Sequence, residues 1–206
     1  AQPLRGFHII EVGPGPGGLT RSLLKAGADH VVAIERDPHC FEALKPLVDI
    51  SCGKLTVIQN DALKIIPQTV VTSPFKIVAN LPYHIGTQLL LNWLKDLEGL
   101  HSLTLMFQKE VALRITASPG SKDYGRLSVL CQYLCQTSRL FDLPPQAFTP
   151  VPKVFSSIVR LEPKVLTDEE KKIVPYLEAI TMAAFGQRRK MIRKSLRSLF
   201  CEDILK

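Results

Sequence analysis

The sequence predicts an α/β fold in which a seven-stranded, doubly wound, Rossmann-like sheet is followed by a short, partial C-terminal helical domain. Two observations predict it. Short apolar runs alternate with segments of helical periodicity, as in wound βαβ sheets. The last two predicted strands follow one another with no helix between them. The chain has 206 residues, of which 46% are hydrophobic, so it can bury the core of one such domain plus a small addition.

In the first half of the chain, strands and helices alternate. An apolar run predicts the first strand over residues 7–12, and a glycine-rich stretch over 13–18 ends it. Leu19, Leu23 and Leu24 recur at helical spacing and predict a helix over 19–26. The same patterns predict strands over 31–34, 55–58 and 75–79, and a helix over 41–48.

In the second half, the predicted order is helix 88–97, strand 103–107, helix 110–116 and a loop over 118–124. Two further strands are predicted over 127–135 and 154–161, joined by a proline-rich loop over 143–152. A late pair of strands without an intervening helix is typical of the doubly wound sheets found in methyltransferases. We therefore expect a methyltransferase domain over residues 1–162.

Pro163 marks the predicted domain boundary, and residues 163–206 form a basic helical segment. Thr167 and Glu170 have the spacing of a capping box, which predicts the start of a helix. The segment is too short to fold alone. We therefore expect it to be a docked extension or part of a larger, truncated second domain.

Charge and cysteine content restrict the class of partner and the compartment. The formal net charge of +7 favours a polyanionic partner. The five cysteines are odd in number and show no zinc-binding spacing, so we expect free thiols, a reducing compartment and no metal. There is no apolar stretch of membrane-spanning length and no signal peptide. We expect a cytoplasmic monomer that does not contact a membrane.

The glycine-rich stretch GPGPGG at residues 13–18 satisfies the GxGxxG pattern between a strand and a helix. Glycines permit a tight turn and let the backbone approach a ligand closely. Such a loop suits a nicotinamide cofactor, a flavin or S-adenosylmethionine, and the motif alone does not choose among them.

Acidic residues at neighbouring strand ends favour S-adenosylmethionine. Glu35 ends the second predicted strand, where a carboxylate can accept hydrogen bonds from both ribose hydroxyls. Asp61 follows the third strand and can accept the amino group of the cofactor's adenine. Glu11 either orders the glycine loop or lies near the sulfonium. The predicted cofactor residues are Glu11, Gly13, Gly15, Gly17, Glu35, Arg36, Asp61, Ala62 and Asn80.

The tetrapeptide Asn80-Leu81-Pro82-Tyr83 follows the fourth predicted strand and indicates the chemistry. An adenine amine is a poor nucleophile because its lone pair is delocalised into the ring. The Asn80 side-chain oxygen and the Leu81 carbonyl can each accept one N–H of that amine, which frees the lone pair for attack on a methyl sulfonium. Pro82 stiffens the turn, and Tyr83 offers a ring on which an extruded base can stack.

These motifs resemble the ribosomal RNA adenine N6,N6-dimethyltransferase family. The resemblance rests on residues 11–20, Glu35, Asp61 and 80–83, and on three further segments, 104–112, 124–128 and 147–154. It implies a methyltransferase fold, S-adenosylmethionine as the donor, and two methyl groups for each target adenine. It also implies catalytic roles for Asn80, Leu81, Pro82 and Tyr83, and places Phe148 against the target base.

Basic residues near the C-terminus indicate the branch of the family. Residues 183–196 resemble the bacterial small-subunit (16S) branch more than the 23S and mitochondrial branches. A dense basic helix suits phosphate backbones. The predicted RNA-binding residues are Lys109, Arg114, Arg126, Arg188, Arg189, Lys190, Arg193 and Lys194.

The sequence thus predicts dimethylation of two adjacent adenines of small-subunit rRNA in a pre-30S particle. Two alternatives stay open. One is a 23S rRNA or DNA adenine-N6 methyltransferase, and the other is a non-catalytic RNA-binding assembly factor. An oxidoreductase is least favoured, because no hydride-transfer acid is evident and the 80–83 motif would have no role.

Overall fold

The computed structural model describes residues 1–186 and 191–200, and in these ranges no helix is long and apolar enough to cross a membrane. Within this part of the chain, seven strands form one sheet in the order β3-β2-β1-β4-β5-β7-β6. The first five strands pair in parallel, and β7 is antiparallel to both of its neighbours. This confirms the predicted fold class. The strands are β1 (His8–Val12), β2 (His30–Glu35), β3 (Leu55–Gln59), β4 (Phe75–Asn80), β5 (Leu100–Gln108), β6 (Cys135–Leu143) and β7 (Ser156–Pro163).

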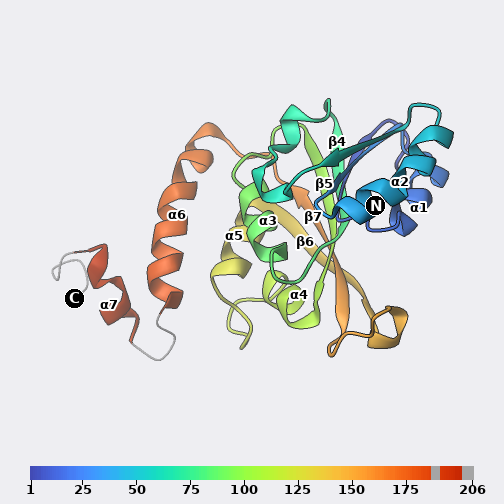
Figure 1. The fold of residues 1–206 in the computed structure, drawn as a ribbon. Coiled ribbons are helices and arrows are strands. Elements are labelled where there is room, and N and C mark those ends of the chain that lie inside the picture. The colour runs from blue at the N-terminus through green and yellow to red at the C-terminus, as the bar shows by residue number, and fades with distance from the viewer. Residues whose placement is uncertain (187–190, 201–206) are drawn as a thin grey trace.

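Helices cover both faces of the sheet (Figure 1). On one face, Ile9 and Val31 of the sheet pack with Leu44 of a helix in one buried cluster. On the other face, sheet residues such as Leu105 pack against helices that carry Leu89. The helices of the first face are α1 (Gly18–Lys25) and α2 (Pro38–Ile50), and those of the second are α3 (Gly86–Trp93), α4 (Lys109–Ile115) and α5 (Arg126–Leu134). Short 3-10 helices are η1 (Ala62–Lys64), η2 (Pro67–Thr69) and η3 (Pro145–Ala147).

The strand predicted over residues 127–135 is wrong, because this segment forms helix α5 and the sixth strand is β6. The segment is apolar almost throughout, so its pattern does not distinguish a buried strand from a buried helix. In the structure its buried side chains recur at helical spacing, and the Ser128 hydroxyl accepts the Gly125 N–H at 3.1 Å at the helix start. Strand β6 escaped prediction because it lies at the sheet edge with mostly exposed side chains.

The C-terminal segment begins with α6 (Asp168–Gly186), and the predicted capping box is confirmed. The Thr167 hydroxyl accepts the Glu170 N–H at 3.2 Å, and the Glu170 carboxylate accepts the Thr167 N–H at 2.8 Å. Tyr133 of α5 donates its hydroxyl to the Glu170 carbonyl at 3.1 Å. Helix α6 therefore stands beside α5, with α7 (Ile192–Ser195) and η4 (Leu196–Ser198) beyond it (Figure 1). The boundary at residue 162 stays a prediction.

Candidate active site

The carboxyl ends of the parallel strands meet at one edge of the sheet, at the lower side of Figure 1. The glycine loop follows β1 there, Asn80 ends β4, and α4 begins directly after β5. Because β7 runs antiparallel, its first residue Ser156 lies at this same edge, opposite Gln108. Open α/β sheets bind ligands at the carboxyl edge. The fold therefore gathers the predicted site residues at one place.

The glycine loop and the 80–83 motif lie against each other. Gly13 has φ +68°, and a Cβ added to it would lie 3.9 Å from the Asn80 carbonyl oxygen and 3.8 Å from Cδ of Pro82. Gly17 has φ +84°, and a Cβ there would lie 2.7 Å from Cδ2 of Leu44. Glycine is thus required at 17 by packing and backbone conformation together. At 13 glycine lets the loop run beside the 80–83 motif.

The Glu35 carboxylate is buried and organises the loop. It accepts hydrogen bonds from three backbone N–H groups, those of Gly15 at 3.1 Å, Arg36 at 2.8 Å and Asp37 at 2.8 Å. Two of these end on Oε1 and one on Oε2, so an acceptor position is left on Oε2. The Arg36 side chain is exposed. Glu35 therefore ties the end of β2 to the glycine loop and keeps limited capacity for a ribose hydroxyl.

Glu11 is 1% exposed at the end of β1, and its Oε2 has no hydrogen-bond partner among the described residues. Burial raises the pKa of Glu11 to about 7, the nearby Thr20 hydroxyl opposes this shift, and the negative charge of Glu35 adds to it. Unpaired buried carboxylates are costly in a folded protein. Glu11 thus differs from a simple loop-capping residue, and a cationic neighbour would stabilise its ionised form.

Asp61 lies after β3 at the same edge. Its Oδ1 accepts the Leu63 N–H at 3.0 Å and so caps η1, while its own N–H donates to the Asn60 side chain at 2.8 Å. Ala62 is buried behind it. The Asp61 carboxylate is half-buried, and one oxygen carries the cap. Its second oxygen is therefore the atom suited to bind a ligand amine.

The first three residues of the 80–83 motif have distinct environments. The Asn80 side chain is exposed at the strand end and has no hydrogen-bond partner within the described ranges. The Leu81 side chain is 2% exposed and anchors the turn in the core. The Pro82 carbonyl accepts the N–H groups of Ile85 and Gly86 at 3.2 and 3.0 Å, which starts α3. The polar atoms at positions 80 and 81 thus lie on a turn fixed on both sides.

The hydroxyl groups of Tyr83 and Ser156 are 2.7 Å apart, and the Tyr83 side chain is 38% exposed. This contact joins the turn after β4 to the start of β7 and fixes the orientation of the ring. Sequence patterns gave no indication of Ser156, because its partner is 73 residues away in the chain.

Phe148 lies in the connection between β6 and β7, directly after η3, and is half-buried. The connection begins and ends at the carboxyl edge, since Leu143 pairs with Ser156. The aromatic ring contacts found among the described residues do not include Phe148. The fold therefore brings Phe148 to the correct edge, and its contact with a target base stays a prediction.

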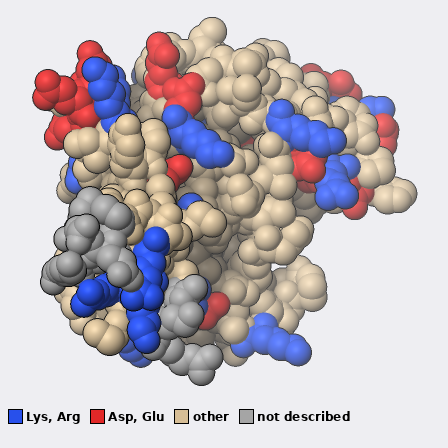
Figure 2. All heavy atoms as spheres, turned by 90° about the vertical axis from the view of Figure 1, so that its left-hand side faces the viewer, with Lys and Arg blue, Asp and Glu red and all other residues tan. Residues whose placement is uncertain are grey.

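The predicted RNA-binding residues fall into two groups. Lys109, Arg114 and Arg126 are carried by α4 and α5, where Arg114 pairs with Glu110 at 3.4 Å across one helical turn. Arg193 and Lys194 are exposed in the last turn of α7. The predicted RNA-binding residues Arg188, Arg189 and Lys190 lie outside the described residues. In Figure 2, Lys and Arg side chains lie at both the upper and the lower end of this face, while most Asp and Glu side chains lie in its upper half.

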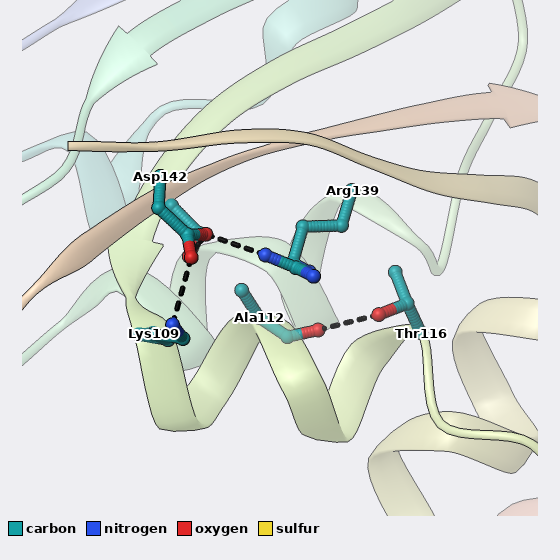
Figure 3. A network of polar contacts seen from close by, with 6 residues as sticks. Lys109, Ala112, Thr116, Arg139 and Asp142 are labelled. Atoms are coloured by element: carbon teal, nitrogen blue, oxygen red, sulfur yellow. Dashed lines mark hydrogen bonds and ion pairs between the residues drawn. The ribbon is translucent and has the colours of Figure 1, made fainter.

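Lys109 has a partner that the sequence did not reveal. Its Nζ is 2.8 Å from Oδ2 of Asp142, whose Oδ1 accepts from Arg139 at 2.6 Å (Figure 3). The same Oδ1 accepts from the Ser157 hydroxyl at 2.7 Å. In the same view the Thr116 hydroxyl donates to the Ala112 carbonyl at 3.0 Å near the end of α4. Asp142 was overlooked because it belongs to β6, the strand that the sequence pattern missed.

A groove beside α6 lies apart from this edge, and the described residues form no metal-binding cluster. A groove of about 810 Å³ between α6 and the turn after α3 is lined by Leu97, Leu166 and Val174, near the amino end of β5. It is remote from Asn80 and belongs to the docking of α6. Groups of three or more His, Cys, Asp or Glu side chains placed to hold a metal ion are absent from the described residues.

The chain matches the family model described as ribosomal RNA adenine dimethylase over residues 1–206. The ribosomal RNA small subunit methyltransferase A of Sinorhizobium medicae is 52% identical over 210 residues, covering 100% of this chain and 75% of that protein. The protein of the same name from Caulobacter vibrioides is 50% identical over 204 residues, covering 99% of this chain and 78% of that protein.

Two solved structures share the fold at lower identity. A dimethyladenosine transferase from Plasmodium falciparum has a TM-score of 0.77 at 27% identity, over 92% of this chain and 67% of that one. The 23S rRNA methyltransferase ErmE has a TM-score of 0.75 at 27% identity, over 98% of this chain and 80% of that one.

Proposed function

The chain belongs to the ribosomal RNA adenine dimethylase family, and from that premise we propose that it transfers methyl groups from S-adenosylmethionine to the N6 amines of two adjacent adenines in small-subunit (16S) rRNA. The product is N6,N6-dimethyladenosine, formed during ribosome assembly on a pre-30S particle. Such an enzyme acts in the cytoplasm, as a monomer and without a metal.

One observation carries the proposal. The Gly13 backbone lies beside the Asn80 carbonyl and the Pro82 ring, so the loop typical of cofactor binding and the turn that carries the amine acceptors form one site. An isolated glycine loop suits several cofactors, and an isolated proline turn suits many folds. Their contact at the carboxyl edge of a methyltransferase-type sheet favours methyl transfer to an amine.

The residues at this edge fit S-adenosylmethionine. Bound there, this cofactor supplies a methyl group on a positively charged sulfur. Glu35 offers an Oε2 position to a ribose hydroxyl, and Asp61 offers a free carboxylate oxygen to the adenine amine. Gly13 and Gly15 present a backbone without side chains in the way. The buried Glu11 carboxyl, with Oε2 unpaired among the described residues, suits a cationic ligand group.

The polar atoms of the catalytic motif suit the activation of an adenine amine. The Asn80 side-chain oxygen and the Leu81 carbonyl accept its two N–H groups, which draws the nitrogen toward tetrahedral geometry and frees its lone pair. Tyr83, held by Ser156, and Phe148 stack on the extruded base. The proton leaves to water once the amine has become cationic, so no strong base is required. Because the product of the first transfer keeps one N–H, the same pocket serves a second.

The sequence relatives favour the small subunit over the 23S alternative. The two solved structures are equally distant at 27% identity, and one of them is a 23S enzyme. The relatives at 50 to 52% identity carry the small-subunit name. Identity of this order over the whole chain, including residues 183–196, supports the same substrate here.

Methyl transfer to competing substrates tests the proposal. The intact protein is incubated with S-adenosylmethionine labelled in its methyl group and with small-subunit precursor particles, large-subunit precursor particles or DNA. We expect label in small-subunit rRNA alone. Label in 23S rRNA or DNA would favour the corresponding alternative, and binding of precursor particles without label would identify a non-catalytic assembly factor.

A further inference from the structure

Asp142 connects three elements at the edge that carries the candidate active site. Its partners are Lys109 at the start of α4, Arg139 on its own strand β6, and Ser157 on β7. Ser157 follows Ser156, the residue that holds the Tyr83 hydroxyl. The β7 partner of Asp142 is thus the neighbour in the chain of the residue that holds the predicted stacking ring.

In this network the Asp142 carboxylate is less exposed to solvent than its two cationic partners, Lys109 and Arg139. The side chain of Asp142 is 26% exposed, whereas those of Lys109 and Arg139 are 43% and 37% exposed. Three donors, Lys109 first, then Ser157 and Arg139, hold the pKa of Asp142 well below its usual range. One carboxylate therefore keeps two cations close together that would otherwise repel each other, and the group retains an excess positive charge.

An aromatic ring completes this surface. Lys109 Nζ lies 5.6 Å from the centre of the Phe155 ring, which is 49% exposed, and the Lys109 N–H donates to the Phe155 carbonyl at 2.9 Å. Backbone and side chain of Lys109 are thus both fixed. Surface ion pairs contribute little to folding stability, so stability alone gives little reason for this network.

We propose that Asp142 is a positioning residue for RNA, holding the Lys109 ammonium and the Arg139 guanidinium as a preformed clamp for a phosphate of the strand whose adenine enters the site. The inference rests on the proposed function. Phosphates are bound by Lys and Arg, and fixing the donors in advance lowers the entropic cost of binding. The clamp lies at the edge where the adenine is held, so it sets the register of the strand.

Net charge and positioning predict opposite changes in RNA affinity when Asp142 is neutralised, and the test uses this difference. Asp142→Asn removes one negative charge beside a polyanion, so electrostatics alone predicts tighter RNA binding and a steeper salt dependence. Positioning predicts the opposite. With small-subunit precursor particles as substrate, we expect Asp142→Asn to raise KM at least about threefold, to change kcat less than about twofold and to leave the salt slope no steeper.

The matched control is Glu42→Gln, which removes the same charge from an exposed i,i+3 pair with Lys45 on α2, on the other face of the sheet. We expect its KM to be unchanged or slightly lower. A lower or unchanged KM for Asp142→Asn, as in this control, would overturn the inference. Failure of the proposed function is distinct, because the unmodified protein would then transfer no methyl group to the particles.

Three further variants keep the test valid if Asp142→Asn misfolds, and they identify a residue through which Asp142 acts. Ser157→Ala removes only the hydroxyl that pins the carboxylate and keeps every charge, so we expect a smaller rise in KM and no change in net electrostatics. Asp142→Asn should raise KM less in the Lys109→Gln background than in the unmodified protein, because only the Arg139 contact is then left to lose. Unchanged KM in Ser157→Ala, or additive effects in the pair, contradicts positioning.

Discussion

At the scale of single residues, the buried Glu11 carboxyl has the most unusual environment near the candidate site. It is almost fully enclosed at the end of β1, close to Thr20 and to the negative Glu35. An ionised carboxylate in such a place lacks the solvation that it has in the unfolded chain. A buried carboxylate that lowers the free energy of unfolding when it is ionised favours a role in ligand binding. A positively charged cofactor group nearby would stabilise the ionised form of Glu11.

The pH dependence of folding follows from this shift. The pKa of Glu11 rises from 4.5 to about 7 on folding, so between these values the folded state binds more protons than the unfolded state. The contribution of this group is therefore neutral below about pH 4.5, becomes destabilising as the pH rises, and reaches its full penalty above about pH 7, at most about 3 kcal/mol. Glu11→Gln should abolish this component.

Urea unfolding at pH 5 and pH 8 measures the difference. We expect Glu11→Gln to gain stability relative to the unmodified protein at pH 8 and little at pH 5. Parallel pH profiles for the two proteins would show that Glu11 is not shifted.

At the scale of elements, the turn between β1 and α1 depends on one glycine for two reasons. Gly17 has φ +84°, and a Cβ there would lie 2.7 Å from the buried Leu44 side chain of α2. Gly17→Ala therefore adds a steric clash to a backbone cost, and we expect a loss of about 2 to 4 kcal/mol in the free energy of unfolding.

Gly27→Ala is the matched control for Gly17→Ala. Gly27 has φ +87° and no atom within 4 Å of an added Cβ, so only the backbone cost of about 1 kcal/mol remains. Equal losses in the two variants, measured by urea unfolding, would mean that α2 does not pack against the loop as described.

The last turn of α7 presents Arg193 and Lys194 to solvent. Replacing both by Gln should weaken binding to small-subunit precursor particles and reduce the slope of log Kd against log salt by about 1 to 2, since each phosphate contact contributes roughly one counterion. The slope is measured between low and physiological salt. An unchanged slope would show that α7 faces away from the RNA.

Sequence patterns predicted the elements that have a clear periodicity or a clear motif. The alternation of strands and helices up to α4 follows from buried parallel strands, and Thr167 and Glu170 fixed the start of α6. The failure at α5 has a physical cause, because a run with few polar side chains, here Ser128 and Gln132, does not distinguish a buried strand from a buried helix. Strand β6 is an exposed edge strand and carries no apolar stripe.

The same limits apply to the candidate site. Gly13, Glu35, Asp61 and Asn80 were predictable because each stands at a strand end, where the fold brings residues to one edge. The Glu35 bond to the Gly15 N–H, the Tyr83–Ser156 contact and the Asp142 network are set by tertiary packing. Spacing along the chain holds no information about such pairs.

At the scale of the whole molecule, the net charge and the position of the basic helix α7 both favour RNA binding at the carboxyl edge of the sheet. The net charge of +7 suits a polyanion. Helix α7 with its basic residues lies toward the same end of the molecule as the carboxyl edge of the sheet (Figure 1). An RNA bound across this end would place a base at Asn80 while its backbone contacts basic side chains. The small α6–α7 segment thus extends the surface that the sheet alone would offer.

Activation of an adenine amine by the Asn80 oxygen and the Leu81 carbonyl can be measured through its product. Mass spectrometry of nucleosides from small-subunit rRNA, after reaction with the unmodified protein or with Asn80→Ala, tests it most directly. We expect N6,N6-dimethyladenosine with the unmodified protein, and a loss of about 10²-fold or more in its rate of formation with Asn80→Ala, while particle binding is retained. Equal rates of dimethyladenosine formation with both proteins would show that the Asn80 side chain does not activate the amine.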